Sequence, residues 1–309
     1  MTNHAEWIFD DTGLIDLNFQ GTERVIGAYL LPTSDGLALV ECGPSSTIDH
    51  LLGGIRVLGY DPGDLRHILV THIHLDHAGA AGVLMARYPN VQMYVHDVGA
   101  PHMVDPAALI RSASRIYGDD MDRLWSEIRP VPEDRVTVLR DGDMVQIGGR
   151  ALEARYTPGH ASHHIAYVDA ANDSIFTGDV AGVRIPPSTD VWPPTPPPDI
   201  DIDAWHRSIT IIRDRQPARL LLTHFGAFDD IERHLSQLDR RLDGWVEFVG
   251  SLERDGLDRD AIVGRLGELV RDEMDESGPN LESSFALTTP HGMSVDGLLR
   301  YLRKRREAS

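Results

Sequence analysis

The six residues HIHLDH, from His72 to His77, hold three histidines and one aspartate and constrain the fold more than any other stretch. The apolar run LRHILV precedes them at 65–70, and AGAAGVLMARY at 78–88 has the pattern of a helix. The cluster is therefore predicted to lie on a turn that joins a strand to a helix. Because open α/β sheets bind ligands at the C-terminal ends of their strands, we interpret the cluster as a functional site.

Strand-like segments occur in two groups along the chain. The first group falls within 6–41, 65–70 and 91–95, and the second within 135–179, while 218–226 is expected to form a further strand with its turn. Two sheets packed face to face, with helices on their outer sides, account for this order. The helical and irregular residues 97–129 are expected to form a flap over the site.

The C-terminal part of the chain has a different pattern. Residues 183–201 contain seven of the 19 prolines, so this segment is predicted to be extended, and a connector is preferred to a substrate-binding role. Residues 229–309 are expected to form a helical extension beyond a catalytic domain at 1–228. A stripe of apolar residues at helical spacing indicates packing against a core or a partner: Ile231, Leu235, Leu238, Leu242, Trp245 and Val249.

The composition restricts the partners and the kind of site. The single cysteine, Cys42, excludes an internal disulfide and a cysteine-rich zinc site, and it is expected to be buried. The formal net charge of −19 disfavours a nucleic-acid partner, because phosphate binding depends on Lys and Arg. No apolar run approaches the roughly 18 residues of a membrane span, and the N-terminal residues do not resemble a signal peptide. We expect a cytoplasmic protein with a small-molecule substrate, and homo-oligomerisation is left open.

Three further residues of metal-binding type follow strand-like segments elsewhere in the chain, namely His160, Asp179 and His224. Together with the first cluster they give seven candidate ligands, whereas a catalytic zinc takes three protein ligands and a water. We therefore divide them between two ions. His72, His74 and His160 would hold the first ion, Asp76, His77 and His224 would hold the second, and Asp179 would bridge the two.

This ordered set resembles the His-x-His-x-Asp-His signature and downstream ligands of the metallo-β-lactamase superfamily, and over residues 6–228 it is most similar to the glyoxalase II-like hydrolases. The resemblance implies an α+β fold, a four-layer αββα sandwich with a dinuclear site at one edge of the sheets. Glu41 stands where many members have an aspartate, so its supporting role is left open. Asp179 is not replaced by cysteine, unlike in the lactamases with a thiolate ligand, and the inserted domain of the RNA-processing exonucleases is absent.

The expected activity is metal-dependent hydrolysis of an ester, thioester or lactone. Two cations about 3.5 to 4 Å apart lower the pKa of a shared water from about 15.7 toward roughly 7, which supplies hydroxide at neutral pH. Asp76 is the predicted catalytic residue, since it could accept a proton from the nucleophile besides binding metal. Zinc is the default ion, although iron and manganese accept the same ligands.

Three other functions are left open by the same residues. A persulfide dioxygenase of this fold would use one iron, held by two histidines and one aspartate. A phosphodiesterase or nuclease is disfavoured by the charge, and a non-catalytic metal module would need only four ligands. His163 and His164 are expected to support the ligands, while Arg184 and Trp192 either contact substrate or lie on the surface. The pocket walls are expected to come from the turns, residues 97–129, the proline segment and the C-terminal helices.

Overall fold

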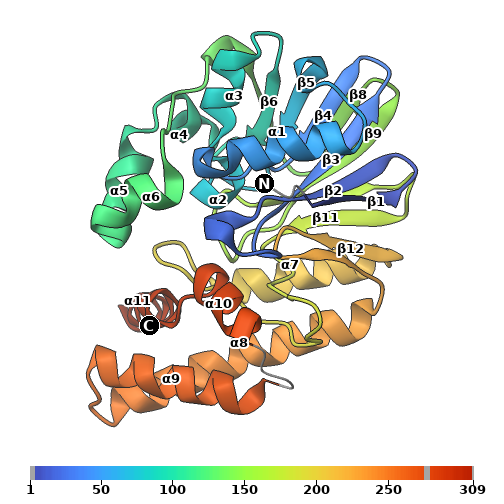
Figure 1. Ribbon diagram of the computed structural model, residues 1–309. Coiled ribbons are helices and arrows are strands. Elements are labelled where there is room, and N and C mark those ends of the chain that lie inside the picture. Colours follow the sequence, from blue (N-terminus) through green and yellow to red (C-terminus); the bar gives the residue numbers. More distant parts are fainter. Residues whose placement is uncertain (1–3, 275–278, 308–309) are drawn as a thin grey trace.

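Two sheets lie face to face in the computed structural model, which describes residues 4–274 and 279–307 (Figure 1). Three hydrophobic clusters mark the layers. One fills the space between the sheets and includes Leu31 and Leu152, a second lies under α1 (Ile48–Val57) on the outer side of the first sheet, and a third lies between the second sheet and α7 (Ile202–Asp214). This is the predicted αββα sandwich.

The first sheet has seven strands in chain order. They are β1 (Ala5–Phe9), β2 (Thr12–Asp16), β3 (Gly27–Thr33), β4 (Gly36–Val40), β5 (Leu65–Leu69), β6 (Gln92–His96) and β7 (Val136–Leu139). The strands from β4 onward are parallel. Both faces are covered, so nearly every residue of β4 is buried, and alternate residues serve different clusters: Leu39 packs under α1 and Val40 packs between the sheets.

The second sheet has six strands in the order β13-β12-β11-β10-β9-β8. They are β8 (Met144–Ile147), β9 (Arg150–Tyr156), β10 (Ile165–Asp169), β11 (Ser174–Gly178), β12 (Arg219–Leu222) and β13 (Gly226–Phe228). Strands β11 and β12 are parallel, and α7 connects them over the outer face. The sequence predicted these strands apart from β13, which covers only three residues, but it grouped β7 with them, whereas β7 pairs with β6 in the first sheet.

The remaining helices form two groups around the sandwich. Helices α2 (Leu75–Ala78) and α3 (Ala81–Arg87) follow β5, and α4 (Ala100–Val104), α5 (Ala107–Tyr117) and α6 (Met121–Trp125) make up the predicted flap. The C-terminal group contains α8 (Ile231–Arg254), α9 (Arg259–Glu273), α10 (Pro279–Thr288) and α11 (His291–Glu307). Within the described ranges, no helix is both long enough and apolar enough to cross a bilayer.

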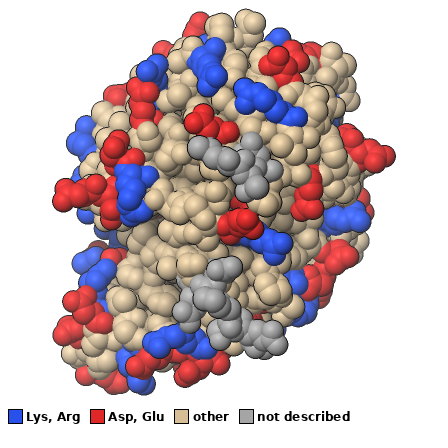
Figure 2. All heavy atoms as spheres, viewed as in Figure 1, with Lys and Arg blue, Asp and Glu red and all other residues tan. Residues whose placement is uncertain are grey.

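The apolar stripe on α8 packs inward, as predicted. Leu235, Leu238 and Leu242 are fully buried and share a cluster with Leu222 of β12 and Leu298 of α11. That cluster spans the predicted boundary between 1–228 and 229–309, and the division into two domains stays a prediction. On the face shown in Figure 2, acidic side chains separate the basic ones, so its described residues present no continuous basic patch.

Candidate metal centre

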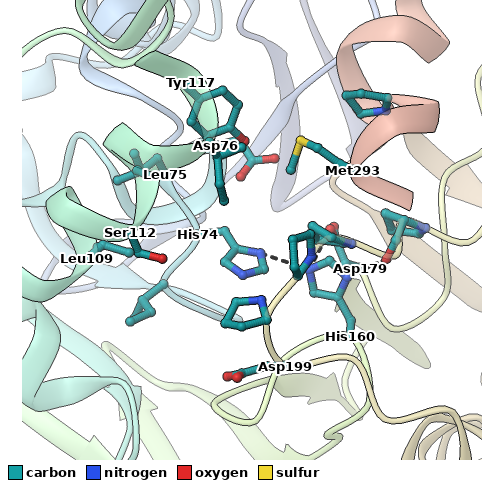
Figure 3. Close-up of a pocket in the computed structure, with 18 of the residues that line it drawn as sticks. His74, Leu75, Asp76, Leu109, Ser112, Tyr117, His160, Asp179, Asp199 and Met293 are labelled. Atoms are coloured by element: carbon teal, nitrogen blue, oxygen red, sulfur yellow. Dashed lines mark hydrogen bonds and ion pairs between the residues drawn. The ribbon is translucent and has the colours of Figure 1, made fainter. Parts of the chain in front are cut away.

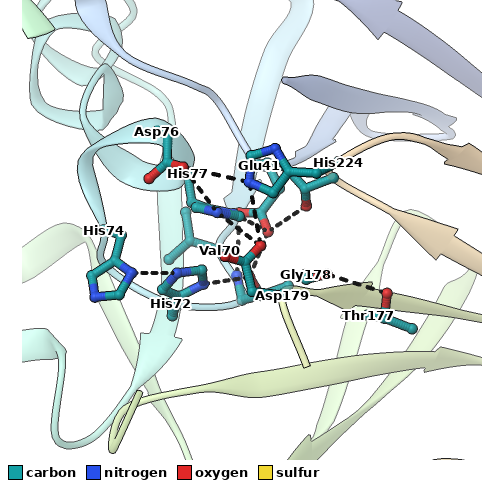
Figure 4. Close-up of polar contacts among 12 residues, drawn as sticks. Glu41, Val70, His72, His74, Asp76, His77, Thr177, Gly178, Asp179 and His224 are labelled. Atoms are coloured by element: carbon teal, nitrogen blue, oxygen red, sulfur yellow. Dashed lines mark hydrogen bonds and ion pairs between the residues drawn. The ribbon is translucent and has the colours of Figure 1, made fainter. Parts of the chain in front are cut away.

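The seven predicted ligands meet at one edge of the sandwich. His72, His74, Asp76 and His77 lie on the turn after β5 and the start of α2, and the remaining three follow β9, β11 and β12. All four segments therefore reach the site from the C-terminal ends of strands, where the backbone is free of sheet pairing. The structure brings together every residue that the sequence singled out as a ligand, and Figure 4 shows them apart from His160.

Their ligand atoms fall into three overlapping groups. In each group the nitrogen and oxygen atoms lie within 4.8 Å of one another: His72, His74 and His160; His72, His77 and Asp179; Asp76, His77 and His224. Within the first group, His74 Nδ1 lies 2.9 Å from both His72 Nε2 and His160 Nε2. Within the third, His224 Nε2 lies 3.4 Å from Asp76 Oδ2. The first and third groups are the two sets of ligands predicted from the sequence.

Asp179 lies between the two sets. Its Oδ2 is 3.3 Å from His160 Nε2, and its Oδ1 is 3.2 Å from His77 Nε2 and 3.4 Å from His224 Nε2. Each carboxylate oxygen thus faces a different set of histidines. This is the geometry that a bridging ligand requires.

The donor atoms fit divalent cations. His77 Nε2 and Asp179 Oδ1 are both buried and make no hydrogen bond, an arrangement that costs free energy unless a cation satisfies them. Burial and the neighbouring His160 lower the pKa of His74 to about 4, and burial with His77 holds the pKa of His72 well below its usual range. Both rings are therefore neutral at neutral pH, which is the form that binds a metal.

Contacts behind the site fix which ring nitrogen faces inward. His160 Nδ1 donates to the carbonyl of Pro194 at 2.8 Å, and His224 Nδ1 donates to the carbonyl of Val25 at 2.5 Å. A protonated Nδ1 leaves the Nε2 lone pair free to bind an ion. Both acceptors are main-chain carbonyls, so neither contact could be found from residue types in the sequence.

Glu41 supports two of the histidines. Its Oε1 accepts hydrogen bonds from His77 Nδ1 at 3.1 Å and from the hydroxyl of Thr71 at 2.5 Å. Because the single Thr71 hydroxyl proton is used in this way, His72 Nδ1, 3.0 Å from the same hydroxyl, must donate to it. Glu41 therefore orients His77 directly and His72 through Thr71, which answers the question that the sequence left open.

His164 also lies behind the ligands, as expected. Its Nε2 accepts a hydrogen bond from the backbone N–H of Asp179 at 3.2 Å, and its Nδ1 lies 2.9 Å from the Thr157 hydroxyl. The ring therefore holds the turn that presents Asp179. His163 lies closer to solvent and lines the cavity over the site.

The alternatives offered for Arg184 and Trp192 are both wrong. Arg184 is buried, forms an ion pair with Asp230 at 2.5 Å and stacks on Phe228. Trp192 is completely buried under the guanidinium of Arg241, which lies 3.6 Å from the centre of its ring. Both side chains are buried, and neither lines the cavity over the site. The apolar residues around Trp192 come from the C-terminal helices, which the local sequence does not reveal.

A cavity of about 600 Å³ opens over the ligands (Figure 3). Its walls come from the ligand turns, α5 and α6, residues 194–199, and the α10–α11 junction, as expected. Residues 194–199 of the segment at 183–201 line the cavity, and the preference for a connector over a substrate-binding role stays a prediction. The lining residues Leu109, Ala113 and Tyr117 were not predicted individually, although their spacing of four residues indicates a helix face.

Comparisons with known proteins agree with this geometry. A family model described as the metallo-beta-lactamase superfamily matches residues 21–224. A metallo-beta-lactamase fold-containing protein of Sulfurisphaera tokodaii is 28% identical over 179 residues, which are 56% of this chain and 66% of that protein. An N-acyl homoserine lactonase of Agrobacterium fabrum is 28% identical over 37% of this chain and 39% of its own length. A hydroxyacylglutathione hydrolase of Synechococcus is 28% identical over 49% of this chain and 47% of its own length.

Solved structures are similar to this chain over more of its length than the sequence relatives are. A metallo-beta-lactamase family protein of Thermus thermophilus has a TM-score of 0.66 at 20% identity, covering 91% of this chain and 89% of that one. An archaeal superfamily protein of Sulfolobus tokodaii has a TM-score of 0.64 at 20% identity, covering 94% of this chain and 98% of that one. At this identity the likeness establishes the fold, while the curated relatives above are matched over at most 66% of their own length.

Proposed function

Because the chain belongs to the metallo-beta-lactamase superfamily, we propose that it is a hydrolase that cleaves an ester, thioester or lactone at a site for two metal ions. The observation that carries this proposal is the position of Asp179, whose two oxygens each face a separate set of histidines. A site for a single ion would leave one of the two sets of histidines with no metal to bind. Zinc suits the imidazole and carboxylate ligands, and iron or manganese would also be accepted.

The bonds proposed for cleavage agree with the names of the relatives. Those names include an N-acyl homoserine lactonase, a hydroxyacylglutathione hydrolase and an atrochrysone carboxyl ACP thioesterase. The match to a hydroxyacylglutathione hydrolase confirms the resemblance to the glyoxalase II-like group. The absence of a continuous basic patch among the described residues on the face in Figure 2 gives no support to a phosphodiesterase acting on nucleic acid.

The ions, when bound, would activate a water and stabilise negative charge on the substrate oxygen. The chain contributes the remaining steps. Asp76 is partly exposed and lines the cavity, so its carboxylate can accept a hydrogen bond from the attacking water and take up its proton. Burial raises the pKa of Asp76, but His77 and His224 outweigh this effect and lower it to about 2, so the carboxylate is ionised at neutral pH and can accept a hydrogen bond.

The test compares the zinc-loaded chain with the Asp179→Ala variant on chromogenic aryl-ester, lactone and phosphodiester substrates. We expect the unmodified chain to hydrolyse an ester or lactone, and the variant to lose most of its bound metal and activity because both sets of histidines lose their shared ligand. Asp229→Ala, at an exposed position outside the site, is the matched control and should retain both. Full turnover by the Asp179 variant would refute the proposal.

A further inference from the structure

One wall of the cavity is the apolar face of α5. Leu109, Ala113, Ile116 and Tyr117 are spaced so that they lie on one side of the helix, and all four line the cavity. Ile116 is 40% exposed, which is unusual for a large apolar side chain on the inner face of a helix. Apolar surface left open in a concave site is typical of a binding site for an apolar ligand.

The other walls continue this apolar surface. Met293, on α11, lies across the cavity from Leu109 and Ser112 in Figure 3, and Leu287 of α10 lines the same side. At the end near α6, the rings of Phe19 and Trp125 are stacked with their centres 5.6 Å apart. A hydrocarbon group of a substrate that extends away from the metal-binding residues would therefore contact apolar side chains on several sides.

Apart from the proposed metal ions, the described side chains that line the cavity offer no unpaired arginine or lysine. Among the described residues that line it, Arg123 is the single arginine or lysine, and it is paired with Asp120 at 3.0 Å and donates to Gln20 at 2.7 Å. Asp199 adds a carboxylate to the wall, where it accepts a hydrogen bond from the Ser162 hydroxyl at 2.7 Å. An anionic substrate group would enter beside this carboxylate with no unpaired cation to receive it among those lining residues.

Building on the proposed hydrolase activity, we propose that the cavity selects substrates with a long, uncharged hydrocarbon acyl group and discriminates against acyl or leaving groups that carry carboxylates. Glutathione thioesters belong to the disfavoured class, because the peptide carries carboxylates. Each buried methylene should raise kcat/KM by up to about fourfold until the cavity is filled.

The first experiment measures kcat/KM of the zinc-loaded chain for p-nitrophenyl acetate, butyrate and octanoate, and for an S-acyl glutathione. We expect kcat/KM for the octanoate ester to exceed that for the acetate ester by at least about 20-fold. After each value is divided by the rate of uncatalysed hydrolysis, the glutathione thioester should have the lowest kcat/KM. Equal rates for acetate and octanoate, or a preference for the glutathione thioester, would overturn the selectivity while leaving the hydrolase function intact. Hydrolysis of none of these substrates would instead count against the hydrolase function.

A binding measurement tests the apolar cavity independently of hydrolysis. N-phenyl-1-naphthylamine is uncharged and fluoresces in apolar surroundings, so its affinity for the metal-free chain reports the apolar wall alone. We expect saturable binding that competes with octanoate ester hydrolysis in the loaded chain. Lack of saturable binding would overturn the inference whatever the substrate assays show.

Two tryptophan substitutions on α5 locate the effect. Ser112→Trp would fill the cavity, because Ser112 lies on the lining face. The variant should lower the ratio of octanoate to acetate kcat/KM at least fivefold and reduce the affinity for the dye. Ser114→Trp puts the same side chain on the exposed side of the helix and should change neither quantity. Equal effects of the two variants would contradict the assignment of this wall.

Discussion

Glu41 stands where many members of the superfamily have an aspartate, yet its side chain still contacts a metal-binding histidine. It follows β4 with a φ of 65°, a left-handed conformation that costs about 1–2 kcal/mol for a residue with a side chain. The carboxylate that results is buried and accepts hydrogen bonds from His77 and Thr71. The unfavourable backbone conformation of Glu41 therefore places its carboxylate where it orients the metal-binding rings.

Glu41→Gln tests this role with almost no change in size. One carboxylate oxygen becomes an NH₂ group, which would face either the backbone N–H of Thr71, now 3.3 Å from Oε2, or the donors at Oε1. We expect metal affinity to fall by about 10- to 100-fold, measured by competition with a chromogenic chelator. Glu6→Gln, at an exposed position of β1, is the control and should bind metal normally. Unchanged affinity in Glu41→Gln would show that the contact is not needed.

The ligands themselves could be predicted from the sequence, and their supports could not. His160, Asp179 and His224 are recognisable because each follows a strand-like segment and has a side chain that binds metal. The carbonyls of Val25 and Pro194 are available in any residue, so only the folded backbone shows that they face a histidine. The burial of Arg184 was missed because its partner, Asp230, lies 46 residues away.

At the scale of elements, α7 and α8 are joined by His206. Its Nδ1 lies 2.9 Å from Asp239 Oδ1, and its Nε2 lies 2.9 Å from Asp243 Oδ1. Both ring nitrogens can donate only when the imidazole is protonated. Burial lowers the pKa of His206, but the hydrogen bonds to Asp239 and Asp243 outweigh burial and raise it overall.

This raised pKa predicts a pH-dependent contribution to stability. The contribution is complete below the unfolded pKa of about 6.5 and is lost as the pH rises through the higher folded pKa. His206→Gln should therefore reduce the free energy of unfolding in urea more at pH 5.5 than at pH 9, by about 1 kcal/mol or less. His50→Gln, whose ring Nδ1 makes no hydrogen bond, is the control. A loss that is larger at pH 9 would contradict the assignment.

Close packing of α11 holds the proline wall of the cavity. A Cβ on Gly297 would overlap the carbonyl oxygen of Thr195, whereas a Cβ on Gly264 of α9 would meet nothing within 4 Å. Gly297→Ala should consequently lower the melting temperature. Gly264→Ala should be neutral or raise it, since alanine favours a helix by about 1 kcal/mol over glycine. A stabilised Gly297 variant would show that α11 does not pack closely on the proline segment.

The elements differ in how well the sequence reveals them. The strands and α8 were predictable because apolar residues recur with the period of one buried face, or form short buried runs. The proline segment was expected in the pocket wall, but the contacts that hold 194–199 there were not predictable, because Arg300 and Lys304 of α11 bind the carbonyl of Pro198 over more than 100 residues of chain. Proline content predicts an extended segment but not what lies beside it.

For the whole molecule, the αββα arrangement brings four strand ends to one edge, and the helices on either side enclose the cavity. Segments as far apart as Glu41 and Thr223 contact each other there, at 3.4 Å. The resemblance carried by the ordered ligands implied a site at this edge. The shape of the cavity depends on how the flap and the C-terminal helices pack, which local patterns do not specify.

The most direct test of the two-metal site is the number of metal ions bound per chain, measured by mass spectrometry of the purified protein after equilibration with zinc, iron and manganese in turn. Two ions per chain are expected, falling to one or none in Asp179→Ala, because this carboxylate faces both sets of histidines. A single iron per chain, bound equally well without Asp76 or His224, would contradict the two-metal site and favour an oxygenase of the same fold.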